Sequence, residues 1–239
     1  VAVPASVIEN AAEQLIQGVS GAAGLLGEVV AKHPSVATKI SKALCQSDNE
    51  QTRRMAMTIV ANAFIFQENL AGGSGALSNI RSIDETRNST STNLLSKADI
   101  LAEWHKILKI NYWPIFDIAR RIVEVLPSGQ ATDMLECLAQ TAGRLLSQKL
   151  TRSHDLTGSI FQKLIVDRKF LAAFYTTPPS AALLMGLALS SKAMPTGAGW
   201  GDRDKIESLR IADFACGTGT LLSAAYHRIA QLHELSGGD

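Results

Sequence analysis

The sequence predicts a mainly α-helical protein in which a helical bundle is followed by the beginning of an α/β domain. Through residues 1–150, apolar side chains recur at the three- and four-residue spacing of amphipathic helices, without the alternation that half-buried strands show. Residues 209–222 instead have the pattern of a short strand, a glycine turn and a helix start. Apolar residues make up 46% of the 239, which is enough to bury a sizeable core. We therefore expect two domains, at residues 1–150 and 151–239.

Charge and cysteine content narrow the class of protein. The chain has 23 Lys and Arg against 22 Asp and Glu, so its formal net charge is +1 and any nucleic-acid surface must be local. The cysteines Cys45, Cys137 and Cys216 form no Cys-x-x-Cys pair, which argues against a disulfide framework and a zinc site. No apolar run reaches membrane-spanning length, and the first residues lack the basic start of a signal peptide. These features predict a cytoplasmic protein without a metal.

Glycine and proline separate the helices predicted within residues 1–70. Four glycines between residues 18 and 27 loosen the helical pattern, so two helices are expected before residue 34. His33-Pro34 ends the second helix and Pro34 starts a third. Asp48-Asn49 is expected to cap a long fourth helix. The apolar faces expected in these helices are Val7, Ala11, Leu15 and Val19; Leu25, Val29 and Val30; Val36, Ile40 and Leu44; and Met55, Ile59, Val60, Phe64 and Ile65.

Residues 71–95 are rich in Gly, Ser, Thr and Asn and predict a mobile loop. Ser96 is expected to cap the next helix, with Asp99 completing a shortened capping box. Tyr112-Trp113-Pro114 interrupts the helical pattern, and the last helix of this first domain is expected over about residues 131–146. The apolar faces expected here are Ile100, Leu101, Trp104, Ile107 and Leu108; Ile115, Ile118, Ile122 and Val125; and Met134, Leu135, Leu138, Ala142 and Leu145.

These apolar stripes most simply form the core of a helical bundle. The alternative is that some faces dock a partner subunit, with Trp104, Tyr112 and Trp113 as candidates, because aromatic side chains often anchor interfaces. The pairs Arg53-Arg54 and Arg120-Arg121 are interpreted as solvated helix faces, with phosphate contact as the alternative.

The stretch from Leu209 to Leu222 holds the strongest functional signal. Its apolar residues before the glycines suit a buried parallel strand, and Gly217 and Gly219 can adopt positive φ or let a ligand approach the backbone. The helix expected from Thr220 to about residue 235 then offers free N–H groups at its positive end. A dinucleotide fingerprint would need a third glycine where Leu222 stands, and no Gly-Lys-Ser/Thr loop is present. Residues 191–206 are interpreted as a glycine-rich surface connection to this stretch.

The string Asp213-Phe-Ala-Cys-Gly-Thr-Gly219 resembles the S-adenosylmethionine loop of Rossmann-like methyltransferases. It is most similar to that of the N6-adenine DNA methyltransferases of restriction–modification systems, such as type I modification subunits. The resemblance implies a Rossmann-like α/β domain, S-adenosylmethionine as the cofactor, DNA as the substrate, and a specificity and a restriction subunit as partners. It implies cofactor contacts from Asp213, Ala215, Cys216, Gly217, Thr218, Gly219 and Leu222.

A second element of the same family lies upstream. Tyr175-Thr-Thr-Pro178-Pro179 resembles the Tyr-Thr-Pro-like element that covers the methionine end of the cofactor and leads into a helix, here expected over residues 180–189. One extra threonine separates Tyr175 from the proline, so both Thr176 and Thr177 are candidates for the hydrogen-bonding hydroxyl. Asp155-Leu-Thr-Gly158 and Phe161-Gln162 also resemble the start of that family's catalytic domain. The cofactor contacts implied here are Tyr175, Thr176, Thr177 and Pro178.

The family's Asn/Asp-Pro-Pro-Tyr/Phe segment, which receives the flipped adenine, has no counterpart, since the only Pro-Pro pair is Pro178-Pro179. The acidic residue that would bind the ribose is missing too. We expect both beyond Asp239, in a longer enzyme of which this chain alone is inactive and carries no catalytic residue. Two alternatives stay open: an S-adenosylmethionine-dependent enzyme acting on RNA or protein, and a helical interaction module whose glycine turn binds nothing.

Overall fold

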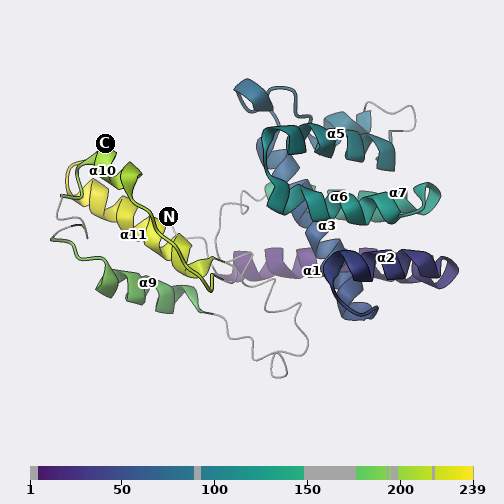
Figure 1. Ribbon diagram of the computed structural model, residues 1–239, viewed down its shortest axis with the longest axis horizontal. Helices are drawn as coiled ribbons and strands as arrows, with labels where there is room; N and C mark the ends of the chain where they lie inside the picture. The colour runs from purple at the N-terminus through teal and green to yellow at the C-terminus, as the bar shows by residue number, and fades with distance from the viewer. Residues whose placement is uncertain are drawn as a thin grey trace. The chain divides into compact units, whose positions relative to one another are not determined.

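The computed structural model describes residues 5–88, 93–147, 176–192, 194, 199–216 and 219–238. The chain divides into two compact units, Val1–Arg152 and Ser153–Asp239 (Figure 1). In both units the described residues are mostly helical, which confirms the mainly α class predicted from the sequence.

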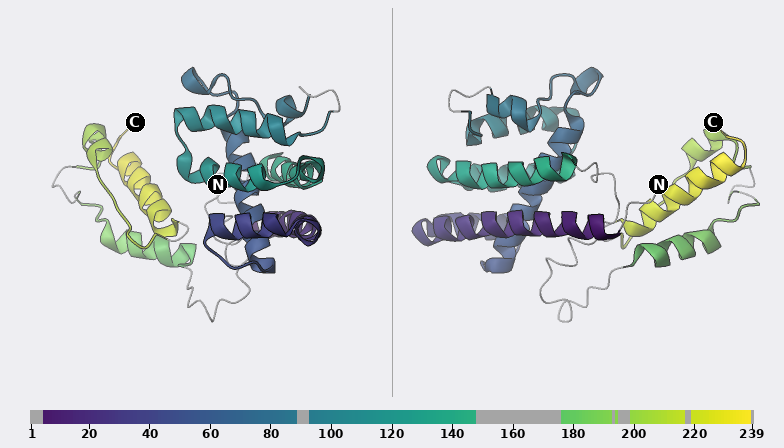
Figure 2. Two further views of the ribbon diagram at one scale, coloured as in Figure 1. Left: turned by 45° about the vertical axis from the view of Figure 1, so that its right-hand side comes forward. Right: turned by 180° about the vertical axis from the view of Figure 1, so that it is seen from behind.

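The first unit is a bundle built around one central helix. Helix α3 (Glu50–Leu70) packs against α1, α2, α4, α6 and α7, and Figures 1 and 2 show it crossing the other long helices. The remaining elements of this unit are α1 (Ala5–Lys32), α2 (Pro34–Leu44), the 3₁₀ turn η1 (Gly75–Leu77), α4 (Ile83–Asn88), α5 (Lys97–Ile110), α6 (Trp113–Val125) and α7 (Ser128–Ser147).

Helix α1 runs unbroken through the four glycines that were expected to divide it. The two-helix prediction is therefore wrong. A glycine inside a helix costs only about 1 kcal/mol. The apolar face of α1 offsets that cost, because Leu15, Val19, Ala22 and Leu26 are fully buried against α3 and α7. Long helices are held mainly by such packing and not by propensity.

Three of the predicted helix starts in this unit are confirmed. Pro34 occupies the first turn of α2. Asn49 caps α3, its side-chain oxygen accepting from the Thr52 amide at 2.8 Å. Ser96 caps α5 by accepting from the Asp99 amide at 3.1 Å.

Part of the predicted loop at 71–95 is helical, because Ser82 and Glu85 cap α4 reciprocally. The Ser82 amide donates to the Glu85 carboxylate at 2.8 Å, and the Glu85 amide donates to Ser82 Oγ at 3.1 Å.

The core of the bundle centres on Trp104. Its ring is fully buried and meets Phe64 and Phe116 edge-on, with centroid separations of 5.6 and 5.8 Å. Its Nε1–H donates to Gln67 Oε1 at 2.9 Å, and Gln67 Nε2 in turn donates to the Arg81 carbonyl at 3.0 Å. Trp104 is therefore a core residue and not a docking residue, whereas Trp113 is 55% exposed.

Two predicted apolar faces are shifted. On α3, Met55 is exposed while its neighbours Ala56 and Met57 are buried. On α6, Phe116, Ala119, Ile122 and Val123 form the buried face, and Ile115 and Ile118 lie at its edge. The face of α7 is as predicted, with Met134, Leu135, Leu138, Ala142 and Leu145 all buried.

The second unit contains α9 (Pro178–Ala188), α10 (Arg203–Ser208) and α11 (Thr220–Leu235). No strand is present among its described residues, and residues 209–216 have no regular secondary structure. The strand predicted there is therefore not formed. Ile211 is 52% exposed and Phe214 fully exposed, where the prediction buried them. A strand is stabilised by pairing with its neighbours, and the described residues supply none.

The connection before residue 209 is more than a surface loop. Trp200 and Met194 are buried against Leu232 of α11. The indole Nε1–H of Trp200 donates to the Ser190 carbonyl at 2.7 Å, and His233 Nδ1 lies 2.8 Å from the Trp200 carbonyl. Trp200 therefore fastens this connection to α11. None of the helices that the structure describes combines the length and apolar character needed to cross a membrane.

Candidate functional site

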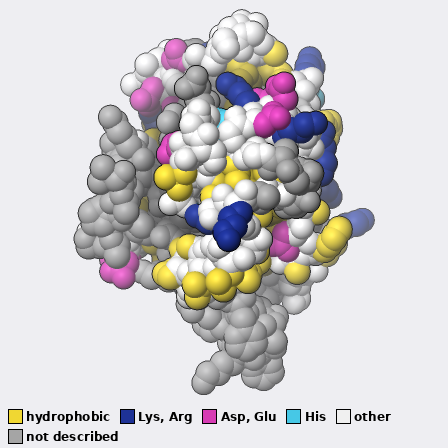
Figure 3. Space-filling model, turned by 90° about the vertical axis from the view of Figure 1, so that its left-hand side faces the viewer, with side chains coloured by type: hydrophobic (Ala, Val, Ile, Leu, Met, Phe, Trp, Pro, Cys, Tyr) yellow, Lys and Arg dark blue, Asp and Glu magenta, His cyan; other side chains and the backbone are white. Residues whose placement is uncertain are grey.

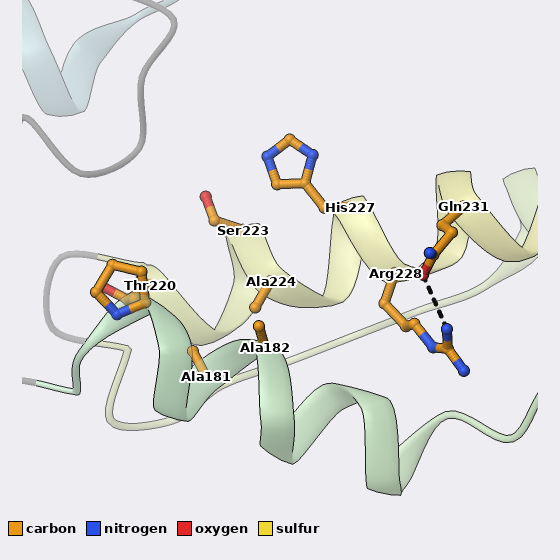
Figure 4. Close-up of a pocket in the computed structure, with 9 residues that line it drawn as sticks. Ala181, Ala182, Thr220, Ser223, Ala224, His227, Arg228 and Gln231 are labelled. Atoms are coloured by element: carbon orange, nitrogen blue, oxygen red, sulfur yellow. Dashed lines mark hydrogen bonds between the residues drawn. The ribbon is translucent and has the colours of Figure 1, made fainter. Parts of the chain in front are cut away.

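Helices α9 and α11 lie side by side and run in the same direction. Pro178 and Thr220, at the first residues of the two helices, line one end of a shared cavity. At the other end, Arg228 Nη2 donates to the Leu189 carbonyl at 3.3 Å. Small side chains allow the close approach: Figure 4 shows Ala181 and Ala182 of α9 opposite Ala224 of α11. The N-termini of both helices are therefore adjacent.

These two N-termini differ in how they are capped. Thr177 caps α9 with its hydroxyl, which accepts from the Ser180 amide. Helix α11 has Gly219 at its N-cap, with φ of +80°, and this residue supplies no side-chain oxygen to the first turn. The positive end of the helix dipole at such an N-terminus favours an anionic ligand.

The turn before α11 is held by its own backbone and by Asp213. The Gly219 amide donates to the Cys216 carbonyl at 2.7 Å. Asp213 is half-buried, and its Oδ1 accepts from the Ala215 amide at 3.0 Å. The carboxylate therefore shapes the turn in the structure described here.

Of the cofactor-binding residues that the resemblance implies and the structure describes, Pro178 is the one that lines the cavity between α9 and α11. Thr220, the first residue of α11, lines the same cavity and directly follows the glycine turn. Thr176 and Thr177 are both exposed, and Thr177 supplies the capping hydroxyl of α9. Ala215, Cys216 and Leu222 are exposed. Tyr175, Gly217 and Thr218, and the two elements within residues 155–162, lie outside the described residues.

The cavity between α9 and α11 has a volume of about 440 Å³ and includes polar residues that the sequence analysis did not single out. Ser223, His227 and Gln231 follow one another at four-residue spacing on α11, which is the signal that could have identified them. Arg228 also lines the cavity and donates through Nη1 to Gln231 Oε1 at 2.8 Å (Figure 4). Its Nε is buried and has no hydrogen-bond partner among the residues that the structure describes. This lining suits a ligand with acceptor oxygens.

Apolar side chains of the second unit remain uncovered. Leu183, Leu184 and Leu187 of α9 are exposed, and α9 is apolar around its whole circumference. Figure 3 looks onto the side of Figure 1 where α9, α10 and α11 are drawn, and hydrophobic side chains (yellow) are open to view there. A helix that is apolar all round is normally buried. This face therefore has the character of an interior surface.

The paired arginines of the first unit are neutralised by nearby carboxylates. Arg53 bonds to Asp48 at 3.1 Å, and Arg54 to Glu50 at 2.7 Å. Arg120 bridges to two acidic residues of its own helix, Asp117 and Glu124. This arrangement favours the solvated-face interpretation over phosphate contact.

Among the residues that the structure describes, no group of three or more His, Cys, Asp or Glu side chains has the arrangement of a metal site. Comparison with protein-family models, with curated proteins and with solved structures gives no match for this chain. The functional assignment therefore rests on the glycine turn, the proline element and the two helices that follow them.

Proposed function

We propose that this chain binds S-adenosylmethionine at the turn between Asp213 and Gly219 and forms part of an N6-adenine DNA methyltransferase, the modification subunit of a restriction–modification system. One observation carries the proposal. The two sequence elements that resemble this family lie far apart in the chain, yet the helices that follow them pack in parallel with adjacent N-termini.

The electrostatics of this arrangement suit the amino-acid end of the cofactor. Two parallel helices place two positive dipole ends at the same place, where a carboxylate is stabilised. Gly219, the N-cap residue of α11, has no side chain that would stand between such a group and the first turn. The cofactor would be contacted on one side by Thr176, Thr177 and Pro178, at the N-terminus of α9. On the other side it would be contacted by residues 213–219.

Methyl transfer needs little acid–base assistance, because the sulfonium is already activated. The enzyme must hold the adenine amino group in line with the methyl group, which is catalysis by proximity, and the base must first leave the duplex. The Asn/Asp-Pro-Pro-Tyr/Phe segment that would hold the base is not among these 239 residues. The chain is therefore proposed to bind cofactor and DNA, with a specificity and a restriction subunit as partners, and to lack catalytic residues of its own.

An S-adenosylmethionine-dependent enzyme acting on RNA or protein would use the same turn. A helical interaction module is the candidate from another class, and the uncovered leucines of α9 favour it. Both enzymes would bind S-adenosylmethionine and the interaction module would not, so a binding measurement distinguishes the module from the enzymes.

Calorimetry with S-adenosylmethionine tests the proposal. The unaltered chain should bind the cofactor, and Asp213→Ala should weaken binding by about 10- to 100-fold, since a hydrogen bond to a charged group is worth about 1.5–3 kcal/mol. Asp204→Ala, which removes an exposed carboxylate from α10, is the matched control and should leave the affinity unchanged. Equal affinities for all three proteins would remove Asp213 from the site.

A further inference from the structure

The first unit has an open hollow between the segment that follows α3 and the C-terminal half of α5. Its volume is about 860 Å³. The polar and charged residues that line it are Ser78, Asn79, Arg81, Glu85, Lys106 and Lys109. No aromatic residue is among those that line it.

A buried carboxylate beside the hollow fixes two of its cations. Glu103 is fully buried and accepts from the Arg81 amide at 2.8 Å, from Arg81 Nε at 3.0 Å and from Lys106 Nζ at 2.9 Å. Burial by itself would raise the pKa of Glu103, but these hydrogen bonds outweigh it and hold the pKa below its ordinary value. Glu103 therefore stays ionised at neutral pH and orients Arg81 and Lys106.

The remaining charges leave the hollow a donor-rich surface. The carboxylate of Glu85 accepts from the Ser82 amide and so serves the first turn of α4. Lys109 lies one turn beyond Lys106, is exposed, and makes no ion pair among the described residues. Three cations, Arg81, Lys106 and Lys109, therefore lie near two carboxylates, and both carboxylates already accept hydrogen bonds from protein donors. Arg81 and Lys106 are paired with Glu103, as the arginines of α3 and α6 are with their own carboxylates, so Lys109 is the cation that distinguishes the hollow.

We propose that this hollow binds a backbone phosphate of DNA, with Lys109, Lys106 and the guanidinium of Arg81 as the charged donors. The proposal rests on the proposed function, which makes DNA the substrate. Ammonium and guanidinium groups beside amide and hydroxyl donors are the groups that contact phosphate oxygens. The hollow offers no aromatic platform on which a base could stack, so the contact is to the backbone and carries no sequence information.

Fluorescence anisotropy with a labelled DNA duplex of arbitrary sequence tests this inference, with salt varied from about 50 to 200 mM. Each phosphate contact releases about 0.9 counterion from the DNA, and this release is lost when the contact is lost. Lys109→Gln should therefore weaken binding about eightfold near 0.1 M salt and reduce the slope of log K against log salt by about 0.9. Lys106→Gln should change both quantities in the same direction. Lys42→Gln, an equal change on an exposed site of α2, should change neither.

Two results would overturn the inference: no binding of the duplex, whether or not inorganic phosphate binds, or equal effects of Lys109→Gln and Lys42→Gln. Circular dichroism of each variant confirms that its fold is retained. Calorimetry with S-adenosylmethionine on the same proteins separates this inference from the proposed function. If the cofactor binds but Lys109→Gln and Lys42→Gln affect DNA binding equally, only the inference about the hollow is refuted. If Lys109→Gln alone weakens DNA binding and the cofactor does not bind, the hollow is supported and the proposed cofactor site is refuted.

Discussion

Replacing Gly18 by alanine should destabilise the first unit, although alanine is the better helix former. Gly18 lies inside α1 where this helix crosses α7. A Cβ added there would be 2.1 Å from Thr141 Oγ1 and 2.8 Å from Thr141 Cβ. Rotation of the Thr141 side chain cannot relieve the contact with its Cβ, and Thr141 Oγ1 is also bonded to the Cys137 carbonyl at 2.8 Å. The helices must therefore move apart.

The matched control is Gly24→Ala on the same helix, where a Cβ would meet nothing within 4 Å. This change should stabilise the protein by about 0.5–1 kcal/mol through helix propensity alone. The propensity gain is common to both variants, so the difference between them is the cost of overpacking, about 1–3 kcal/mol in favour of Gly24→Ala.

Urea unfolding followed by tryptophan fluorescence measures this difference. Trp200→Phe in every protein compared leaves Trp104 and Trp113, both of the first unit, as the reporters. Equal stabilisation by the two glycine replacements would show that α1 and α7 do not approach each other as described.

Two further predictions concern charge and activity. Burial, with the nearby charges of Asp84 and Glu85, raises the pKa of Glu68 above its ordinary value of 4.5, despite a hydrogen bond from the Ile83 amide. A raised folded pKa gives stability below the unfolded value that is lost as pH rises through the folded one. Glu68→Gln keeps an oxygen for Ile83 and should therefore be the more stable protein at pH 7, with the advantage vanishing below about pH 4.5; a constant advantage across this range in urea titrations would contradict the pKa shift. The second prediction is that the 239-residue chain transfers no labelled methyl group from S-adenosylmethionine to DNA, and measurable transfer would refute the absence of catalytic residues.

Local signals in the sequence predicted local structure well. The caps at Asn49 and Ser96 are confirmed because a side-chain oxygen three residues before an amide needs no tertiary contact to bond it. The same rule would have predicted α4 from Ser82 and Glu85, had the surrounding Gly- and Ser-rich composition not outweighed it in the interpretation.

Tertiary contacts decided where the sequence misled. The glycines of α1 do not break the helix, because burial against α3 and α7 exceeds their propensity cost. Trp104 could be a core or a docking residue by spacing alone, and only its partners Phe64, Phe116 and Gln67 identify it as core. Ile211 lacks a neighbouring strand among the described residues, so apolar character alone did not make a strand.

The sequence pointed to the segments that precede α9 and α11 but not to the cavity between these helices. The glycine turn and the proline element are readable as motifs, and the sequence could place them in order but not side by side. Their adjacency comes from the parallel packing of α9 and α11, which depends on the small residues Ala181, Ala182 and Ala224. The polar lining at His227 and Arg228 was missed, because charged and polar residues on a helix are most often simply solvated.

Hydrogen exchange measured with and without S-adenosylmethionine tests the cofactor site most directly. The amides of residues 213–222, which span the glycine turn and the first turn of α11, should exchange more slowly when the cofactor is present. Helix α2 in the first unit should exchange at the same rate in both samples. Unchanged exchange at residues 213–222 under conditions where the cofactor is bound would contradict the account.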